Sequence, residues 1–304
     1  SAAMFIADLL RQSGLPDGVF NVVHGDKVAV DRLLEHPDIA AVSFVGSTPI
    51  AKYVYETGTR NGKRVQALGG AKNHMLVLPD ADLDMAADAA VSAAYGSAGE
   101  RCMAVSVVAA VDSIADQLID KIKTRIPNIK VGAGTDPSSE MGPLITREHR
   151  DKVAGYVHGA AKEGAKVVID GTAKAKDDGF FLNPSLIDEA KPGMKCYDEE
   201  IFGPVLAFTT FKDEEEAVKI ANDTIYGLGA GVWTRDAHQL YTVPRQIQAG
   251  RIWVNQYHSY PAGAPFGGYK QSGIGRENHK MMLDHYRQTK NMLISYNKNK
   301  LGFF

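Results

Sequence analysis

The first part of the chain alternates between helical and strand-like spacing of apolar residues. Apolar side chains recur at helical spacing over residues 2–12, which predicts an amphipathic helix. Later runs predict strands at residues 19–23, 40–45 and 64–68, with helices at residues 27–35 and from Ser47 onward. Ser47 and Pro49 are residue types that commonly begin a helix. This βαβαβ order predicts a parallel sheet with right-handed crossovers, equivalent to half of a doubly wound dinucleotide-binding domain.

A second α/β unit follows the break at Gly69 and Gly70. Its pattern predicts a short strand at residues 75–78 and an Ala-rich helix from Asp80 to about Tyr95. Further strands are predicted near residues 105–111, 166–169 and 205–211, alternating with helices near residues 113–125, 147–163 and 213–222. Residues 170–179 are predicted to form an exposed loop, and residues 286–296 a β-strand flanked by charges. The predicted fold class is therefore α/β.

Composition narrows the classes of partner. The chain has 304 residues, of which 44% are hydrophobic and 23% charged, and its net charge is −2. This balance favours neither nucleic acid nor an anionic membrane as a partner. No apolar run has the length of a membrane span, and the N-terminal residues lack the pattern of a secretory signal. Two cysteines are too few for a disulfide framework, so we expect a protein of the reducing cytoplasm.

Several familiar motifs are missing from the sequence. It contains no His-Glu-x-x-His, Cys-x-x-Cys or Gly-x-Ser-x-Gly pattern, and its nine histidines are scattered, so we expect no metal site. The glycines of Gly227–Gly231 have the wrong spacing for a dinucleotide fingerprint. They are predicted to form a turn into a strand at residues 232–234.

Cys102 is the candidate nucleophile. Small residues surround it, with Gly96–Gly99 before it and Ala104 after it, and such residues leave backbone N–H groups free for an oxyanion. The neighbouring Arg101 adds positive charge, which favours the thiolate. The alternative is an inert buried cysteine, and that is the commoner role of a lone cysteine. Only the wider motif context favours the nucleophile.

That context lies in five ordered motifs, which are Phe44–Thr48, Leu68–Gly70, Gly99–Cys102, Glu199–Val205 and Pro265–Lys270. In order and approximate spacing they resemble the aldehyde dehydrogenase superfamily, over essentially the whole chain. Residues from about 44 to 195 look like methylmalonate-semialdehyde dehydrogenases. Residues from about 197 onward look like acetaldehyde-type and general aldehyde dehydrogenases. The resemblance implies the aldehyde dehydrogenase fold, an aldehyde substrate and NAD or NADP as cofactor.

The resemblance also implies roles for single residues. Cys102 would add to the aldehyde, its own N–H would serve the oxyanion, and the resulting thioester would pass to water or to coenzyme A. Glu200 would bind the nicotinamide ribose, and Phe202 would pack near that ring, whereas the alternative for Glu199 and Glu200 is a solvated pair. The remaining expected site residues are Gly46, Ser47 and Leu68 for the cofactor, Arg101, Tyr260 and Phe266 for the substrate, and Glu100 for catalysis.

Two of these assignments have alternatives of equal weight. Gly46 and Ser47 precede a helix, where backbone N–H groups suit a pyrophosphate, but an ordinary helix cap has the same residues. An aromatic group could wall an aldehyde pocket or belong to a generic hydrophobic core. Its members are Trp253, Tyr257, Tyr260 and Phe266.

The sequence departs from the family pattern at Ala67. The family carries a deacylating glutamate there, and a methyl group cannot accept a proton. The methylmalonate-semialdehyde group also lacks that glutamate and passes its acyl group to coenzyme A. A CoA-acylating semialdehyde dehydrogenase is therefore one alternative function. Glu100 is an alternative source of the base.

The chain also begins late relative to the family pattern, without the upstream half of the cofactor domain. A truncated, non-catalytic family member that acts in assembly is therefore a further alternative. The expected division is a truncated NAD(P)-binding half-domain at residues 1–69, a catalytic domain at residues 70–270, and a C-terminal helix and oligomerisation strand at residues 271–304. The family resemblance implies a homo-oligomer, either a dimer or a tetramer.

Overall fold

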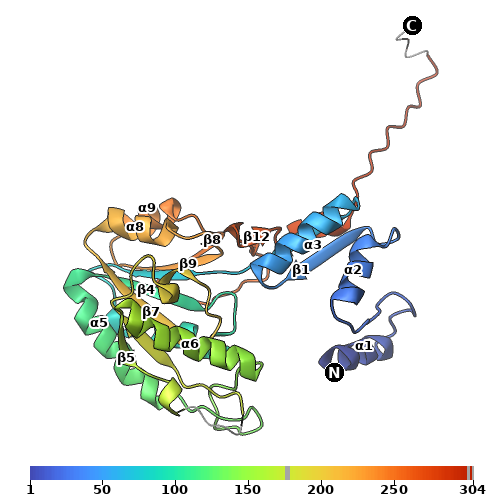
Figure 1. Cartoon of the computed structure of the whole chain (residues 1–304). Coiled ribbons are helices and arrows are strands. Elements are labelled where there is room, and N and C mark those ends of the chain that lie inside the picture. Colours follow the sequence, from blue (N-terminus) through green and yellow to red (C-terminus); the bar gives the residue numbers. More distant parts are fainter. Residues whose placement is uncertain (175–178, 300–301, 303–304) are drawn as a thin grey trace.

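The computed structural model describes residues 1–174, 179–299 and 302, and it confirms the predicted α/β class (Figure 1). The largest sheet has seven strands, in the order β10 (Arg251–Val254), β9 (Gly229–Trp233), β3 (Asn73–Val77), β4 (Val105–Val111), β7 (Val205–Phe211), β6 (Ser185–Asp188) and β5 (Lys166–Ile169). All neighbours in this sheet are parallel except β5 and β6. Parallel sheets are typically covered on both faces, and this explains the nearly continuous apolar run of β4 and the apolar second half of β3.

Helices cover the two faces of this sheet and form two hydrophobic cores. The larger core lies beneath α4 (Leu83–Tyr95), α5 (Asp112–Arg125) and α6 (Arg147–Glu163). The smaller core lies beneath α8 (Glu214–Asn222) and α9 (Gln239–Gln246). The buried face of α4 is mainly alanine, so this helix can pack closely against the strands that carry the site. The short helices and turns between these elements are η1 (Gly96–Gly99), η2 (Ile126–Asn128), η3 (Thr172–Lys174) and α7 (Lys195–Asp198).

A smaller sheet holds the first part of the chain. Its strands β1 (Ala41–Val45) and β2 (Arg64–Leu68) are parallel, and α3 (Thr48–Arg60) crosses between them. Helix α2 (Lys27–Glu35) packs on α3 through Leu34, while α1 (Ala2–Gln12) lies at the far end (Figure 1). Strand β12 (Gly273–Ile274) pairs antiparallel with β2, so the chain returns to this sheet after the large sheet is complete.

The predicted strand at residues 19–23 is wrong, because this segment has no strand in the structure. Val19 and Val23 are exposed by 65% and 70%. A strand needs a neighbour for its N–H and C=O groups, and no described residue pairs with these. The apolar pattern of residues 19–23 is typical of a strand, but no neighbouring strand among the described residues supplies the hydrogen bonds.

Two further predictions about the second half need correction. The glycines of Gly227–Gly231 lie in strands rather than in a turn. Gly227 belongs to β8 (Tyr226–Gly227), and the other two belong to β9. The ring of Tyr257 lies so close to Gly231 that a side chain there would crowd it, and this explains the glycine inside strand β9. Strand β8 pairs with β11 (Tyr269–Lys270). Of the predicted exposed loop, residues 175–178 lie outside the described residues, and Gly171 is buried rather than exposed.

The C-terminal tail also differs from its predicted form. After η4 (Lys280–Met282) and α10 (Leu283–Tyr286), the described residues form no strand, and the tail extends away from both sheets (Figure 1). Leu293 and Tyr296 are each 92% exposed. The predicted strand at residues 286–296 is therefore absent from the isolated chain, because none of the described residues supplies a pairing partner.

Candidate functional site

Cys102 lies in the turn that connects α4 to β4, just before the first residue of this central strand of the seven-stranded sheet. The turn begins with three successive left-handed residues, Ser97, Ala98 and Gly99, with φ of 53°, 55° and 71°. A Cβ on Gly99 would overlap the carbonyl oxygen of Gly203, so the turn runs directly against the segment that follows Glu200. The backbone contact between these two loops brings two separately predicted motifs together.

One small cavity unites most of the predicted reactive groups. Cys102, Arg101, Glu200 and Phe202 all line it, although they come from two segments about a hundred residues apart in the sequence. Phe202 is partly exposed and has a φ of 54°, and its carbonyl oxygen accepts a hydrogen bond from Nε2 of His149 at 2.7 Å. The structure therefore places the thiol, a cation, a carboxylate and an aromatic ring around one space.

The carboxylate of Glu200 is held by the Gly-Gly-Ala segment after β2. Its Oε1 accepts a hydrogen bond from the backbone N–H of Ala71 at 2.9 Å. A Cβ on Gly70 would lie 3.1 Å from Cδ of Glu200, so a residue with a side chain would displace the carboxylate. Burial raises the pKa of Glu200, while the Ala71 N–H and the charges of Lys72 and Lys152 oppose that rise. Of the two alternatives, a solvated pair does not describe Glu200.

The surroundings of the Cys102 thiol oppose its deprotonation. Burial raises its pKa, the carboxylates of Glu200 and Glu277 add to the rise, and the N–H groups of Cys102 and Met103 only oppose it. The guanidinium of Arg101 donates instead to the carbonyl oxygens of Ser92 and Ala93, at 3.1 and 3.4 Å. Arg101 and a Cys102 thiolate attract each other electrostatically, so activation by Arg101 stays a prediction, and burial opposes it. In this form the thiol needs a base to accept its proton.

Glu100 is directed away from the cavity that Cys102 lines. Its Oε1 accepts a hydrogen bond from the N–H of Ile145 at 3.2 Å and lies 3.6 Å from Nε2 of His149. It is not among the residues around that cavity. The structure thus separates Glu100 from the thiol, although the two residues are close in the sequence. A catalytic role for Glu100 stays a prediction that this geometry does not favour.

The aromatic group divides between the site and the core. Phe266 is buried and packs in a cluster with Cys102 and Met103. Tyr260 lies beside it, with 5.0 Å between the two ring centroids. Tyr257 instead packs against the main hydrophobic core, stacked on Trp253 with 4.4 Å between their ring centroids. Phe266 thus lies beside Cys102 and Tyr257 beside the core, while the wall of an aldehyde pocket stays a prediction.

The predicted cofactor residues meet at the carboxyl ends of β1 and β2. The N–H of Gly46 donates to the carbonyl oxygen of Leu68 at 3.1 Å, and Ser47 begins α3 without a side-chain capping bond. Thr48 Oγ1 accepts a hydrogen bond from the N–H of Gly70 at 2.9 Å. This contact links the start of α3 to the segment that holds Glu200. Ligands of open parallel sheets bind at this end of the strands.

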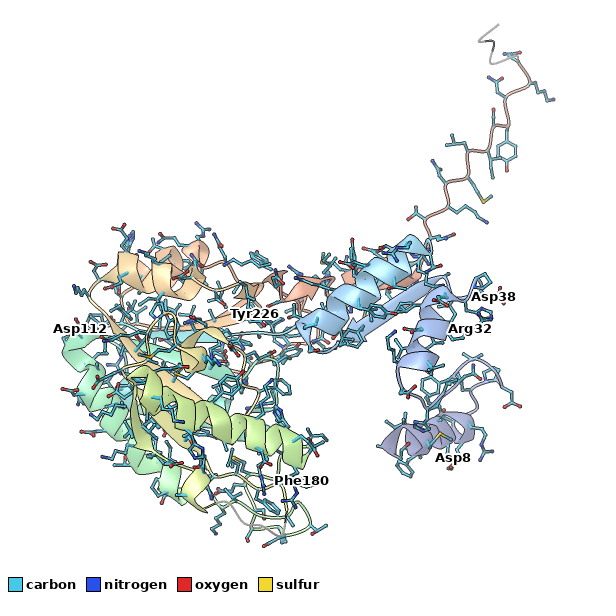
Figure 2. All side chains as sticks on the ribbon, viewed as in Figure 1. Asp8, Arg32, Asp38, Asp112, Phe180 and Tyr226 are labelled. Carbon is cyan, nitrogen blue, oxygen red and sulfur yellow. The ribbon has the colours of Figure 1, made fainter. Side chains whose placement is uncertain are left out.

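Tyr226 lies where the two parts of the molecule meet (Figure 2). Its hydroxyl is hydrogen-bonded to Thr48, which lowers the pKa of Tyr226 against the larger effect of burial. A groove of about 530 Å³ opens nearby between α3 and the 270–274 segment, and it contains neither Cys102 nor Glu200. This groove, which Thr48 and Ala67 help to line, is therefore distinct from the small cavity of Cys102 and Glu200.

Three functional candidates were missed in the sequence. Lys72 and Asn73 are buried beside the cavity. Two adjacent polar residues directly before a predicted buried strand were a signal of a functional role that the sequence offered. Glu277 reaches the site only because its segment follows β12, and its Oε1 accepts a hydrogen bond from Nε2 of Gln66 at 3.0 Å. No local pattern identifies Glu277.

The described residues offer neither a cluster of metal ligands nor a membrane-spanning helix. They contain no group of three or more His, Cys, Asp or Glu side chains able to hold a metal ion. Among the helices in the described ranges, none combines the length and apolar character needed to cross a lipid bilayer.

Comparisons with known proteins agree in naming one family. The model of the aldehyde dehydrogenase family matches residues 1–292. A malonate-semialdehyde dehydrogenase of Pseudomonas aeruginosa is 49% identical over 286 residues, covering 90% of this chain and 56% of that protein. The crystal structure of a methylmalonate-semialdehyde dehydrogenase from Oceanimonas doudoroffii has a TM-score of 0.88 at 47% identity, covering 90% of this chain and 57% of that one.

A second solved structure extends the similarity. A betaine aldehyde dehydrogenase from Staphylococcus aureus, in complex with NAD⁺, has a TM-score of 0.93 at 35% identity. The match covers 99% of this chain and 61% of that one. The chain thus spans less than two thirds of the length of each of these relatives.

Proposed function

This chain belongs to the aldehyde dehydrogenase family, and on that premise we propose that it takes part in NAD(P)-dependent oxidation of an aldehyde through Cys102. The observation that carries the proposal is the shared cavity of Cys102, Glu200 and Phe202. A nucleophile and a carboxylate in one space are what thioester chemistry with a bound cofactor requires. The S. aureus relative was solved in complex with NAD⁺, and this supports NAD or NADP as the cofactor.

The residues at the strand ends fit a dinucleotide. Helix α3 begins without a side-chain cap, so the N–H groups of its first turn are available to a pyrophosphate. Glu200 would accept hydrogen bonds from the ribose hydroxyls, and Phe202 would pack against the nicotinamide ring. When bound, the cofactor supplies the acceptor for a hydride. Gly46, Ser47 and Leu68 are proposed for the phosphate side, since they meet at the same strand ends.

The chemistry of the chain itself centres on the thiol. Because burial raises the pKa of Cys102, a base is needed to take the proton, and we propose Glu200 or Glu277, whose charges reach Cys102. Sγ then bonds to the aldehyde carbon while the carbonyl π electrons move to oxygen, and the N–H of Cys102 is proposed to stabilise that oxyanion. Loss of hydride from the carbon leaves a thioester on Cys102, which a second nucleophile cleaves to restore the thiol.

We propose a semialdehyde that carries a carboxylate as the substrate class. Two relatives act on such compounds by name, and Arg101 supplies a cation beside the thiol. Nε of Arg101 is buried and has no hydrogen-bond partner among the described residues, so an incoming acceptor would satisfy it. Tyr260 and Phe266 are proposed to contact the carbon chain of the substrate.

Addition of aldehyde and NAD⁺ to the purified chain tests the main proposal. We expect NADH absorbance from the wild type and none from Cys102→Ala. The matched control is Cys196→Ala, because Cys196 is buried and lies outside the cavity that Cys102 lines, and this variant should keep its activity. Activity that persists in Cys102→Ala would refute the mechanism. Absence of NADH from a folded wild type would favour the alternative of a non-catalytic member acting in assembly.

The acyl acceptor is a second question, for which Ala67 favours coenzyme A. Its methyl group packs in a cluster with Ala51 and Val54 of α3 and offers no base for a water molecule. Without coenzyme A we expect a burst of one equivalent of NADH followed by slow turnover. Coenzyme A should accelerate the slow phase, since its thiolate needs no such base. Rapid steady turnover in water alone would show that another base, such as Glu277, serves deacylation.

We also propose a homo-oligomer in which the extended tail pairs with a second copy. Met292, Leu293 and Ile294 are exposed in a segment without partners among the described residues, and an exposed apolar strand-forming segment recruits another strand. Deletion of residues 286–304 should reduce the mass measured by light scattering to that of a monomer. A wild-type chain that already runs as a monomer would refute this assembly.

A further inference from the structure

Two consecutive polar side chains are buried where β3 begins. Lys72 is 3% exposed and Asn73 is 1% exposed. A buried polar group destabilises a protein unless hydrogen bonds replace its lost contacts with water. The partners of Lys72 and Asn73 are therefore the first question. They lie on the Cys102 turn, on β9, and on the segment from α7 to Glu199.

Asn73 is bonded to the backbone of the nucleophile turn. Its Nδ2 donates to the carbonyl oxygen of Cys102 at 2.8 Å and to that of Ala104 at 2.9 Å. Its Oδ1 accepts a hydrogen bond from the N–H of Gly229 at 3.0 Å. One amide thus uses both of its donor hydrogens on the turn and its acceptor on β9. The turn is fixed to the centre of the sheet by a side chain that does not touch the thiol.

An irregularity in the sheet allows this contact. Asn73 pairs with Val105 of β4, but the next residue, His74, pairs with Val107. Ser106 is therefore an extra residue on β4, as in a β-bulge. Bulges bend the strand and re-aim side chains, and they are frequent beside active sites. Here the bulge lies directly after the turn whose carbonyl groups Asn73 binds.

Lys72 makes the corresponding contacts on the other loop. Its Nζ donates to the carbonyl oxygen of Cys196 at 2.9 Å and to that of Glu199 at 2.7 Å. The second of these carbonyl groups belongs to the residue directly before Glu200. Burial lowers the pKa of Lys72 to about 8, and the nearby acidic groups, Glu200 among them, oppose that change. Lys72 also lines the cavity that Cys102 and Glu200 share.

We propose that Lys72 and Asn73 act together as a positioning clamp, in which Asn73 fixes the Cys102 turn and Lys72 fixes the Glu200 segment. Both act through backbone carbonyl groups, so they are positioning residues rather than catalytic ones. Because they are neighbours in one chain segment, a single peptide unit sets the distance between the thiol and the carboxylate. The clamp rests on the proposed function only in taking Cys102 and Glu200 as the groups that need alignment.

Hydrogen exchange of the full chain tests the clamp without reference to activity. Asn73→Ala removes the amide, and Asn73→Asp keeps its volume and its acceptor for Gly229 but turns an oxygen toward the two carbonyl groups. Either variant should raise amide exchange in a peptide covering residues 100–105 about tenfold or more, as expected for lost buried hydrogen bonds. Lys72→Met should do the same for residues 196–203.

The matched control is Ser185→Ala. Ser185 is fully buried, its Oγ accepts a hydrogen bond from the N–H of Gly171 at 3.0 Å, and it is not among the residues that line the cavity of Cys102. It should leave exchange in both peptides unchanged. A rise spread evenly over the chain, or no rise in either peptide, would overturn the clamp, since the two side chains would then only contribute to global stability.

A second readout separates positioning from stability. Cys102 should release a burst of p-nitrophenolate from p-nitrophenyl acetate without any cofactor. Asn73→Asp should lower the rate constant of that burst about tenfold or more, because small misplacements of a nucleophile are costly, while KM changes less than about twofold. An unchanged burst in Asn73→Asp would overturn the role of Asn73. If the wild type gives no burst but the exchange pattern holds, Cys102 fails as nucleophile and the clamp stands.

Discussion

Gly99 offers a direct test of how tightly the two site loops are packed. It has a φ of 71°, which a side chain disfavours by about 1–2 kcal/mol. A Cβ at this position would lie 3.0 Å from the carbonyl oxygen of Ala94 and would overlap that of Gly203. Both obstacles are backbone atoms, so neither can swing aside as a flexible side chain could. Overpacking of this kind costs about 1–3 kcal/mol.

We therefore expect Gly99→Ala to lower the free energy of unfolding by about 2–5 kcal/mol, the sum of these two effects. The Cys102 turn and the Glu200 segment would have to move apart, and a displacement of about 1 Å is enough to lower reactivity about a hundredfold. Unfolding in urea measures the first effect. Alkylation of Cys102 by iodoacetamide, resolved by peptide mass spectrometry, measures whether its local environment changes.

Gly155→Ala is the matched control. Gly155 lies on the exposed side of α6, and an added Cβ there has no neighbour within 4 Å. Alanine should stabilise this helix position by about 0.5–1 kcal/mol. If Gly99→Ala unfolds within about 0.5 kcal/mol of the wild type and Cys102 is alkylated at the same rate, the close contact between the loops is not a constraint on the fold.

Three other predictions follow from buried polar groups. Glu200→Gln removes a negative charge that raises the pKa of Cys102, so the pH profile of Cys102 alkylation should move to lower pH, and an unmoved profile would mean that Glu200 does not act on the thiol. Tyr95→Phe deletes a buried hydroxyl that donates to the carbonyl oxygen of Ser185 at 3.0 Å. The free energy of unfolding in urea should fall by about 1 kcal/mol. An unchanged free energy would mean that a water molecule replaces the hydroxyl at that carbonyl. Burial lowers the pKa of His74 from 6.5 to about 4, so the unfolded chain takes up a proton at a higher pH than the folded chain. The free energy of unfolding should therefore fall as the pH drops from about 6.5 to about 4. His74→Gln should flatten this pH dependence, and an unchanged pH dependence would mean that other groups cause it.

The order of elements followed from the sequence because it depends on local pattern. The apolar period located α1, α2, α4 and the strands β1 to β5 and β7, and the five motifs identified the family. Cys102, Glu200 and Phe202 were also named from their motifs, and the structure brings them to one cavity. What these predictions share is that neighbouring residues in the chain carry the signal.

Local pattern was insufficient where a segment needs a pairing partner or a side chain must point in a particular direction. Residues 19–23 and 286–296 have strand-like patterns, but a strand exists only when another backbone accepts and donates its hydrogen bonds. Glu100 is close to Cys102 in the sequence, yet its carboxylate binds the N–H of Ile145 instead. Arg101 adjoins the thiol, but its guanidinium donates to carbonyl oxygens of α4. Proximity in the sequence fixes the backbone neighbourhood and leaves the side-chain direction open.

The sequence by itself thus determined the α/β class, the family and the identity of the candidate nucleophile, since periodicity and motifs are properties of short segments. Only the tertiary structure decided that the Cys102 thiol is partly buried with a raised pKa, because desolvation depends on everything packed around it. It also decided that Glu277 and Asn73 belong to the site. Glu277 arrives through the pairing of β12 with β2, and Asn73 reaches the Cys102 turn beside a register shift between β3 and β4. Both depend on pairings between distant strands, which no local pattern encodes.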